Sequence, residues 1–289
     1  MIFAATAKAR GGAAIGVHCL DPGPALARRH SEFDGLVAMS GTLTPMEYWR
    51  DVLGLAALDA QSLRVPSAFD GDQRRVVLVP TISTAARDRA GSLGAVIQIV
   101  LRTVALQPGP YILFFPSFTY LEAARARLQD GADGLGRVFV QSRRSSLSRR
   151  MALLDSFRKH EGPRVLLAVS GGVFGEGIDL PGGQLLGAIV VGPCLPPVSF
   201  ERAAMSRAFE TTRGAGFAYA MLYPGLQRVV QAAGRVIRTE QDRGVVVLIG
   251  SRFARPEVIA CLPEDWYSYD PIELVPEDPI AALRSFWEG

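Results

Sequence analysis

The sequence predicts an α/β domain built on a doubly wound, mostly parallel sheet with helices on both faces. Short runs rich in β-branched residues alternate with helical patterns along most of the 289 residues. The strand runs are almost continuously apolar, which is typical of parallel strands covered on both faces. A chain of this length can form one large domain or two smaller ones.

Seven segments bounded by turn residues fit buried strands. Each is short enough for a strand, and glycine, proline or serine closes most of them. In order they are Gly35–Ser40, Val76–Pro80, Tyr111–Phe115, Arg137–Gln141, Val165–Ser170, Leu186–Gly192 and Gly244–Gly250. Ligands of such a sheet meet the loops at the carboxyl ends of the strands.

Helical patterns fall between these runs. They cover Pro45–Leu53, Ser92–Leu106, Phe118–Gln129, Ser146–His160, Glu201–Glu210 and Gly225–Arg238. Within Ser146–His160 we expect one core-facing stripe, made of Leu147, Met151, Leu154 and Phe157. The proline-rich, acidic tail after about residue 255 is predicted to end in a short helix, Ile280–Trp287, that packs against the body.

Composition places the chain among globular proteins, with 48% hydrophobic and 20% charged residues and a net charge of +3. No apolar run approaches 18 residues and the N-terminus makes a poor signal peptide, so we expect a cytoplasmic protein with no membrane partner. Cys19, Cys194 and Cys261 lack metal-ligand spacing, and no metal site is expected in this chain. A cluster of arginines either contacts a phosphate backbone or forms a solvated loop and helix start; it comprises Arg143, Arg144, Arg149 and Arg150.

A phosphate-binding pattern occurs near the C-terminal end of the sheet region. Gln231, Gly234, Arg235 and Arg238 have the spacing of one helical face, with the glycine allowing close approach. Arginine's planar fork suits phosphate oxygens. Yet the chain has no Gly-x-x-x-x-Gly-Lys-[Ser/Thr] loop, and its two lysines lie outside glycine-rich turns. The alternative is a solvated basic face, with the apolar residues Val229, Val230, Ala233 and Ile237 turned inward.

Small hydroxyl residues and glycines follow three of the predicted strands. They are the segments Ser40–Pro45, Pro116–Thr119 and Ser170–Asp179, whose backbone amides can approach a phosphate closely. Phe114 and Phe115 fit the core, whereas Phe118 and Tyr120 are candidates for stacking on bases.

Four of these segments, in order, resemble motifs of the second motor domain of superfamily 2 helicases of the XPD/Rad3 and DinG group. VAMSGTLTPMEYW resembles the group's Ser-Gly-Thr-Leu-x-Pro segment, and ILFFPSFTYLE resembles motif IV. FGEGIDLPGGQLLGAIVVGPCLPP is similar to motif V, and QAAGRVIRTEQDRGVVVLIGSRF is similar to motif VI with its trailing Asp-x-Gly strand. The resemblance spans roughly residues 15–255.

The resemblance implies a RecA-like fold and an ATP-driven translocase on single-stranded DNA. Gln231, Arg235 and Arg238 would reach the nucleotide phosphates across a cleft, with Gly234 beside them and Arg238 as the arginine finger. Glu176 and Asp179 would couple nucleotide to DNA, and Ser40 and Thr42 would lie near the domain interface or the DNA path. The candidates for DNA backbone contacts are Ser117, Thr119, Ser170, Gly171 and Gly172.

The group's Walker A loop, its Asp-Glu-Ala-His motif and its four iron–sulfur cysteines belong to the other half of such helicases and are not in this sequence. The resemblance therefore implies a partner, the N-terminal helicase half, attached covalently or in trans. That half would hold Mg²⁺ with ATP and any iron–sulfur cluster, and this chain alone would hydrolyse no ATP. The expected division is an extension over 1–14, a motor domain over 15–255 and a tail over 256–289.

Two other functions stay open. One is a non-enzymatic nucleic-acid-binding or regulatory module with a helicase-like fold. It is disfavoured because such a module need not keep Gln231, Arg235 and Arg238. The other is an unrelated α/β nucleotide-binding enzyme acting alone, which the missing phosphate loop disfavours.

Overall fold

The computed structural model describes residues 2–9, 12–128, 134–171 and 185–289, with side chains from residue 17 onward. Contacts divide the chain into two compact units. The first comprises Met1–Val65 and Leu195–Gln227, and the second comprises Pro66–Cys194 and Arg228–Gly289. We call them the N-terminal unit and the sheet unit.

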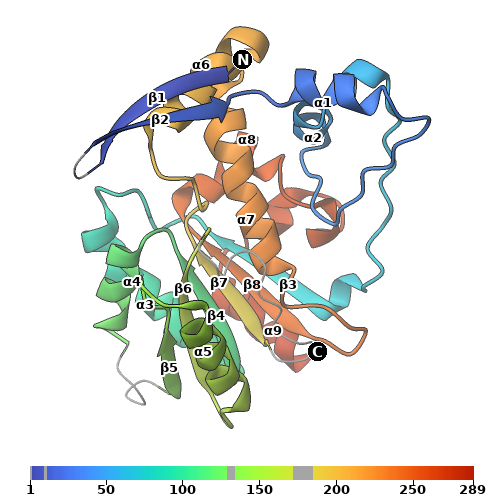
Figure 1. The fold of residues 1–289 in the computed structure, drawn as a ribbon. Helices are drawn as coiled ribbons and strands as arrows, with labels where there is room; N and C mark the ends of the chain where they lie inside the picture. The colour runs from blue at the N-terminus through green and yellow to red at the C-terminus, as the bar shows by residue number, and fades with distance from the viewer. Residues whose placement is uncertain (1, 10–11, 129–133, 172–184) are drawn as a thin grey trace. The chain divides into compact units, whose positions relative to one another are not determined.

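A six-stranded parallel sheet forms the centre of the sheet unit (Figure 1). Its spatial order is β3-β8-β7-β4-β6-β5, so every neighbour pair is reached by a crossover. The strands are β3 (Arg74–Val79), β4 (Pro110–Phe115), β5 (Arg137–Val140), β6 (Arg164–Val169), β7 (Gly187–Val191) and β8 (Gly244–Ile249). Six of the seven predicted strands, and the predicted fold class, are thereby confirmed.

Both faces of this sheet are buried, which explains the continuous apolar runs. Tyr111, Leu113 and Phe115 of β4 join one core cluster, and the alternate residues Ile112 and Phe114 are equally buried on the other face. The first cluster also takes in the helices α3 (Arg89–Leu106), α4 (Phe118–Arg125) and α9 (Pro279–Glu288). The second face receives α5 (Leu147–Lys159), whose Phe157 ring packs edge-on against Phe139 of β5. Phe114 and Phe115 are core residues, as expected.

The α3 helix is long and apolar enough to cross a membrane, judged by length and composition alone. Its apolar side is instead packed in the sheet core through Leu93, Val96, Ile97, Val100 and Val104. This is the arrangement of a core helix. The predicted terminal helix is confirmed as α9, which contacts α3 and β3 and buries Ile280 and Leu283.

The N-terminal unit contains an antiparallel pair that the sequence did not predict, β1 (Ile2–Ala9) with β2 (Gly12–Cys19). It also holds α1 (Gly23–His30), α2 (Met46–Val52), α6 (Phe200–Arg213) and the π-helical turn η3 (Ala218–Leu222). α7 (Tyr223–Ala233) begins in this unit and ends in the sheet unit. The remaining short elements are η1 (Ala56–Leu58), η2 (Gly71–Gln73), η4 (Ser251–Ala254), α8 (Pro256–Ile259), η5 (Glu264–Trp266) and η6 (Pro271–Leu274).

The predictions for residues 35–40 and for the α5 stripe are wrong. Gly35–Ser40 forms no strand, and its apolar side chains are exposed, with Met39 at 84%. The expected α5 stripe is only half buried, because Leu154 and Phe157 are in the core while Leu147 and Met151 face solvent. The proposed division into 1–14, 15–255 and 256–289 stays a prediction.

Candidate functional site

The motif carrying Gln231 and the two arginines does not lie on a single helix. α7 ends at Ala233, and the next residues turn through the bonds Gly234 N to Val230 O, Arg235 N to Ala232 O and Val236 N to Ala233 O. The last two are i to i−3 bonds, which tighten a helix end. The expectation of a helix through Arg238 is therefore wrong, and both arginines extend from the backbone after the helix.

Asp242 holds the backbone that follows this turn. One carboxylate oxygen, Oδ2, accepts the backbone N–H groups of Arg238 and Thr239, each at 2.8 Å. The Asp242 side chain is buried, at 7% exposure. Because the acceptor is ionised and shielded from water, these bonds are stronger than neutral ones. They satisfy two N–H groups beyond the helix end and hold residues 238 and 239 in place.

Gln73, the residue before β3, binds the carbonyl groups of the same turn. Its Nε2 lies 3.1, 2.9 and 2.8 Å from the carbonyl oxygens of Thr239, Glu240 and Asp242. Its Oε1 accepts the backbone N–H of Asp70 at 3.0 Å, in a capping box that begins η2. Every polar atom of this amide is thus engaged, and its orientation follows from its partners. We call residues 234–243 the clamped turn.

The apolar residues of the motif face inward, as the alternative interpretation required. Val229, Val230, Ala233 and Ile237 are all buried. Gln231, Arg235 and Arg238 are half-buried and Gly234 is exposed. The polar residues are accessible on the same segment whose apolar side is in the core.

The predicted DNA contacts at the ends of β4 and β6 have structural partners of their own. Ser117 Oγ accepts the N–H of Tyr120 and so caps α4, which leaves its own hydroxyl hydrogen available. Ser170 Oγ donates to the carbonyl of Phe115 at 3.1 Å, so this hydroxyl can offer a ligand only its acceptor pairs. Thr119 is exposed beside them.

Gly171 occupies a position that requires glycine. Its φ of +75° is left-handed, and a Cβ there would lie 2.7 Å from the Arg228 guanidinium carbon. The Arg228 guanidinium also donates to the carbonyl of Cys194 at 3.4 Å, so it sits at the carboxyl ends of β6 and β7. Burial raises the pKa of the Cys194 thiol to about 11, opposed by Ser170 and by the charges of Arg228 and Arg252. Arg228 is therefore a candidate site residue that the sequence reasoning missed.

The two aromatic candidates differ in exposure. Tyr120 is buried at 4% and packs edge-on against Phe115, so it is a core residue, and a role in base stacking is excluded by its position. Phe118 is half-buried, with the Arg143 guanidinium 5.3 Å from its ring centre. That distance is within range for a cation–π contact.

Ser40 and Thr42 belong to the N-terminal unit. Their hydroxyls lie 3.2 Å apart, and Gln227 Nε2 donates to Thr42 Oγ1. This ties the Ser-Gly-Thr segment to the start of α7. Gly172, Glu176 and Asp179 lie outside the described residues.

The candidate site residues of the sheet unit lie at both ends of the parallel strands. We call these two sides of the sheet its carboxyl edge and its amino edge. Ser117, Ser170 and Gly171 follow strands and lie at the carboxyl edge, whereas the clamped turn precedes β8 and bonds Gln73 just before β3. α7 runs between them, with Arg228 near Gly171 and Gly234 at the turn. The structure therefore brings together the carboxyl-edge candidates and, separately, the candidates of the clamped turn.

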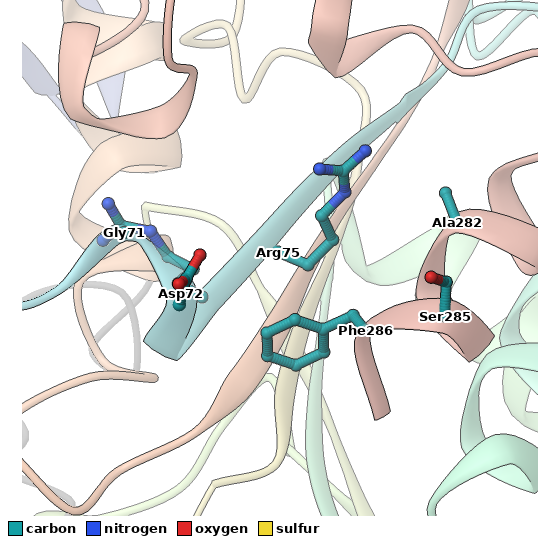
Figure 2. Close-up of a pocket in the computed structure, with 7 residues that line it drawn as sticks. Gly71, Asp72, Arg75, Ala282, Ser285 and Phe286 are labelled. Atoms are coloured by element: carbon teal, nitrogen blue, oxygen red, sulfur yellow. The ribbon is translucent and has the colours of Figure 1, made fainter. Parts of the chain in front are cut away.

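A pocket of about 240 Å³ lies elsewhere, between the start of β3 and α9 (Figure 2). Figure 2 shows Arg75 of β3 opposite Phe286 and Ser285 of α9. None of the predicted site residues lines it. Among the described residues, no group of three or more His, Cys, Asp or Glu side chains could hold a metal ion.

Gln73 and Asp242 were also missed. Asp242 left a signal, since the side chain of an acidic residue can accept the N–H groups of residues three and four positions before it. The sequence holds no comparable signal for Gln73, because the residues that it binds are distant in sequence.

Comparisons with known proteins agree with this fold. A family model described as "Helicase C-terminal domain" matches residues 100–269, more than half of the chain. The human protein named regulator of telomere elongation helicase 1 is 28% identical over 295 residues, covering 90% of this chain and 23% of that protein. Its homologue in Drosophila sechellia is 27% identical over 276 residues, covering 87% of this chain and 28% of that protein.

Two solved structures share the fold. One, titled XPD helicase, has a TM-score of 0.56 at 20% identity and covers 76% of this chain and 39% of its own. The other, Xpd4 of S. tokodaii, has a TM-score of 0.54 at 16% identity and covers 80% of this chain and 43% of its own. The chain spans only about a quarter of the length of the curated relatives. It belongs to the family of helicase C-terminal domains.

Proposed function

We propose that this chain is the second motor domain of an ATP-dependent DNA helicase and that Arg238 is its arginine finger. Gln231 and Arg235 would bind the nucleotide phosphates beside it, and an N-terminal helicase half would supply the phosphate-binding loop. Alone, the chain would hydrolyse no ATP. The family match supports the helicase part of this proposal, and the clamped turn supports the finger.

The observation that carries the proposal is the double restraint on the Arg238 backbone. Asp242 accepts its N–H and that of Thr239, while Gln73 binds the next carbonyls. Stabilising charge in phosphoryl transfer depends on positive groups held in place before the reaction, because little covalent chemistry is left to the protein. A guanidinium on a turn held by these hydrogen bonds satisfies that need better than one on a frayed helix end.

The chemistry of this donor set fits a polyphosphate and not a magnesium ion. Gln231, Arg235 and Arg238 offer hydrogen-bond donors and two positive charges. Mg²⁺ prefers carboxylate and other oxygen ligands, so we assign it to the N-terminal half, together with any iron–sulfur cluster. ATP supplies the transferable phosphoryl group, and the residues of this chain bind and orient its phosphates.

Single-stranded DNA is the proposed nucleic-acid partner, at the carboxyl edge of the sheet. Ser117, Thr119 and Gly171 there offer a free hydroxyl hydrogen, an exposed hydroxyl and an exposed glycine backbone. Arg228 adds a charge at the same edge. Glu176, Asp179 and Gly172 remain part of the proposal from the motif alone.

The proposal is tested with the chain itself. We expect it to bind a labelled oligothymidylate and to show no ATP turnover above background, with or without that DNA. Adding the N-terminal helicase half should produce DNA-dependent turnover. Robust turnover by the chain alone would contradict the proposal, and DNA binding without turnover in the combined protein would favour the non-enzymatic module.

A further inference from the structure

Three loops at one end of the carboxyl edge are joined into a single frame. Gly250 N donates to Val79 O at 3.1 Å, Ser251 N to Ile82 O at 2.9 Å and Gly192 N to Ile249 O at 2.8 Å. The loops that follow β3, β8 and β7 are therefore held in fixed positions. A side chain on this frame is well placed to bind a ligand without rearrangement.

Arg252 and Arg89 come together on this frame around Thr84. Arg89, the first residue of α3, donates its Nε–H to the carbonyl of Thr84 at 3.3 Å. The Thr84 hydroxyl lies 3.0 Å, and Arg252 Nη2 3.7 Å, from where a Cβ would project at Gly192. Gly192 has a φ of +78° and no side chain, which leaves room for both.

The two guanidinium groups repel each other, and no ion pair joins either of them to an acidic side chain among the described residues. In the part of the chain that the structure describes, neither contacts a carboxylate, and the adjacent Asp88 is engaged by Ser83 Oγ at 2.6 Å and by Arg87. The pKa of Arg252 is lowered by burial and then by the charges of Arg89 and Arg255. Thr84 Oγ1 and Arg252 Nε are buried and find no hydrogen-bond partner among the described residues.

We propose that Arg89 and Arg252 form a phosphate seat that binds one backbone phosphate of single-stranded DNA. The seat extends the DNA path of the proposed function and rests on that function. An anion between the two guanidinium groups would relieve their repulsion and accept charge-assisted hydrogen bonds from both. The motif resemblance assigned no DNA contact to either arginine.

A polymer, rather than a single nucleotide, fits the arrangement of charge. The phosphate seat lies where β3 and β8 end, and Arg143 and Arg144 follow β5 at the opposite end of the same edge. From β5 to β3 there are five strand spacings, roughly 24 Å at about 4.8 Å each. A strand of nucleic acid running along the edge would meet both ends, with Ser170, Gly171 and Arg228 between them.

The test measures how the affinity of the whole chain for a labelled oligothymidylate depends on salt concentration. The variants are Arg252→Gln, Arg89→Gln, the double variant and the charge-retaining Arg252→Lys. The seat neutralises one phosphate of single-stranded DNA, so removing both guanidinium groups should lower the slope of log K against log salt by ~0.7, and each single variant should lower it by part of that amount. Arg252→Lys should keep the slope. The matched control is Arg137→Gln, which removes an exposed charge at the amino end of β5.

Each outcome either supports or overturns the binding of a DNA phosphate by Arg89 and Arg252. Slopes that fall in the seat variants and stay unchanged in Arg137→Gln support the phosphate seat, and the same falls on oligouridylate would extend it to RNA. Strong binding with wild-type slopes in Arg252→Gln and Arg89→Gln overturns the seat but leaves the proposed function standing. No binding by the wild-type chain overturns both. A thermal melt identifies a variant that fails to fold. If Arg252→Gln fails to fold, Arg89→Gln decides alone, because it changes only the arginine at the start of α3.

Discussion

Asp242 fixes the position of Arg238 through its backbone N–H. One buried carboxylate oxygen accepts the N–H groups of Arg238 and Thr239, each at 2.8 Å. The Cα of Arg238 therefore cannot shift without breaking two charge-assisted bonds.

Replacing Asp242 with asparagine should destabilise the protein. The amide keeps one acceptor oxygen but loses the charge, and we expect a loss of ~1–3 kcal/mol in the free energy of unfolding. Denaturant unfolding followed by circular dichroism measures it. Glu240→Gln, in the same turn but exposed, is the control and should change stability by less than ~0.5 kcal/mol. Equal effects of the two variants would show that the carboxylate of Asp242 does not hold the turn.

Changing Gln73 to glutamate should loosen the clamped turn. The substitution keeps the acceptor for Asp70 N–H but places a second oxygen against the carbonyls of Thr239, Glu240 and Asp242. We expect faster hydrogen exchange at Arg238 and Thr239, with little change in the strands. Gln73→Met, which removes both the donor and the acceptor without adding charge, should have a smaller effect. Unchanged exchange in Gln73→Glu would mean that Asp242 alone holds the turn.

Gly171→Ala and Gly162→Ala form a matched pair. Both glycines have positive φ, +75° and +88°, so both substitutions should cost ~1–2 kcal/mol of backbone strain. Only at Gly171 would the new methyl group displace a guanidinium, that of Arg228, because nothing lies within 4 Å at Gly162. We therefore expect weaker binding of oligothymidylate for Gly171→Ala alone, measured by fluorescence anisotropy. Equal affinities would place Arg228 outside the DNA path.

The three cysteines should differ in reactivity. Cys19 is exposed, whereas burial raises the pKa of the Cys194 and Cys261 thiols to about 11 each. The reactive thiolate is therefore suppressed in the native protein at two of three positions until the pH approaches that value. Alkylation at pH 8 followed by peptide mass spectrometry should modify Cys19 first and all three after unfolding. Rapid modification of native Cys194 would contradict its burial.

The sheet could be predicted from the sequence because its strands are buried on both faces. Val245 to Ile249 in β8, for example, are all fully buried, so the local run carries the whole signal. Residues 35–40 have a similar composition yet face solvent, since burial depends on a partner strand that local sequence does not specify. β1 and β2 are rich in alanine and glycine, which have low β propensity, so their pairing gave no comparable signal.

The sequence names the candidate site residues but does not predict their geometry. The spacing of Gln231, Arg235 and Arg238 suggested one helical face, and the buried Val236 and Ile237 prolong the helical pattern. The helix nonetheless ends at Ala233, where the next residues turn through i to i−3 bonds, and the Asp242 side chain then binds the N–H groups of Arg238 and Thr239. Arg228 and Gln73 act through contacts between segments far apart in the chain, which a single sequence does not reveal.

The central claim is that Arg238 completes an ATP site whose phosphate loop lies in another domain. The most direct test is ATP turnover by Arg238→Ala in the protein that joins this chain to its N-terminal helicase half. Arg243→Ala is the control, because that guanidinium already binds the carbonyl of Phe286. We predict that Arg238→Ala lowers DNA-stimulated turnover by ~10³-fold or more while affinity for single-stranded DNA stays within a few-fold. Turnover retained near the wild-type rate would contradict the assignment of Arg238 as the finger.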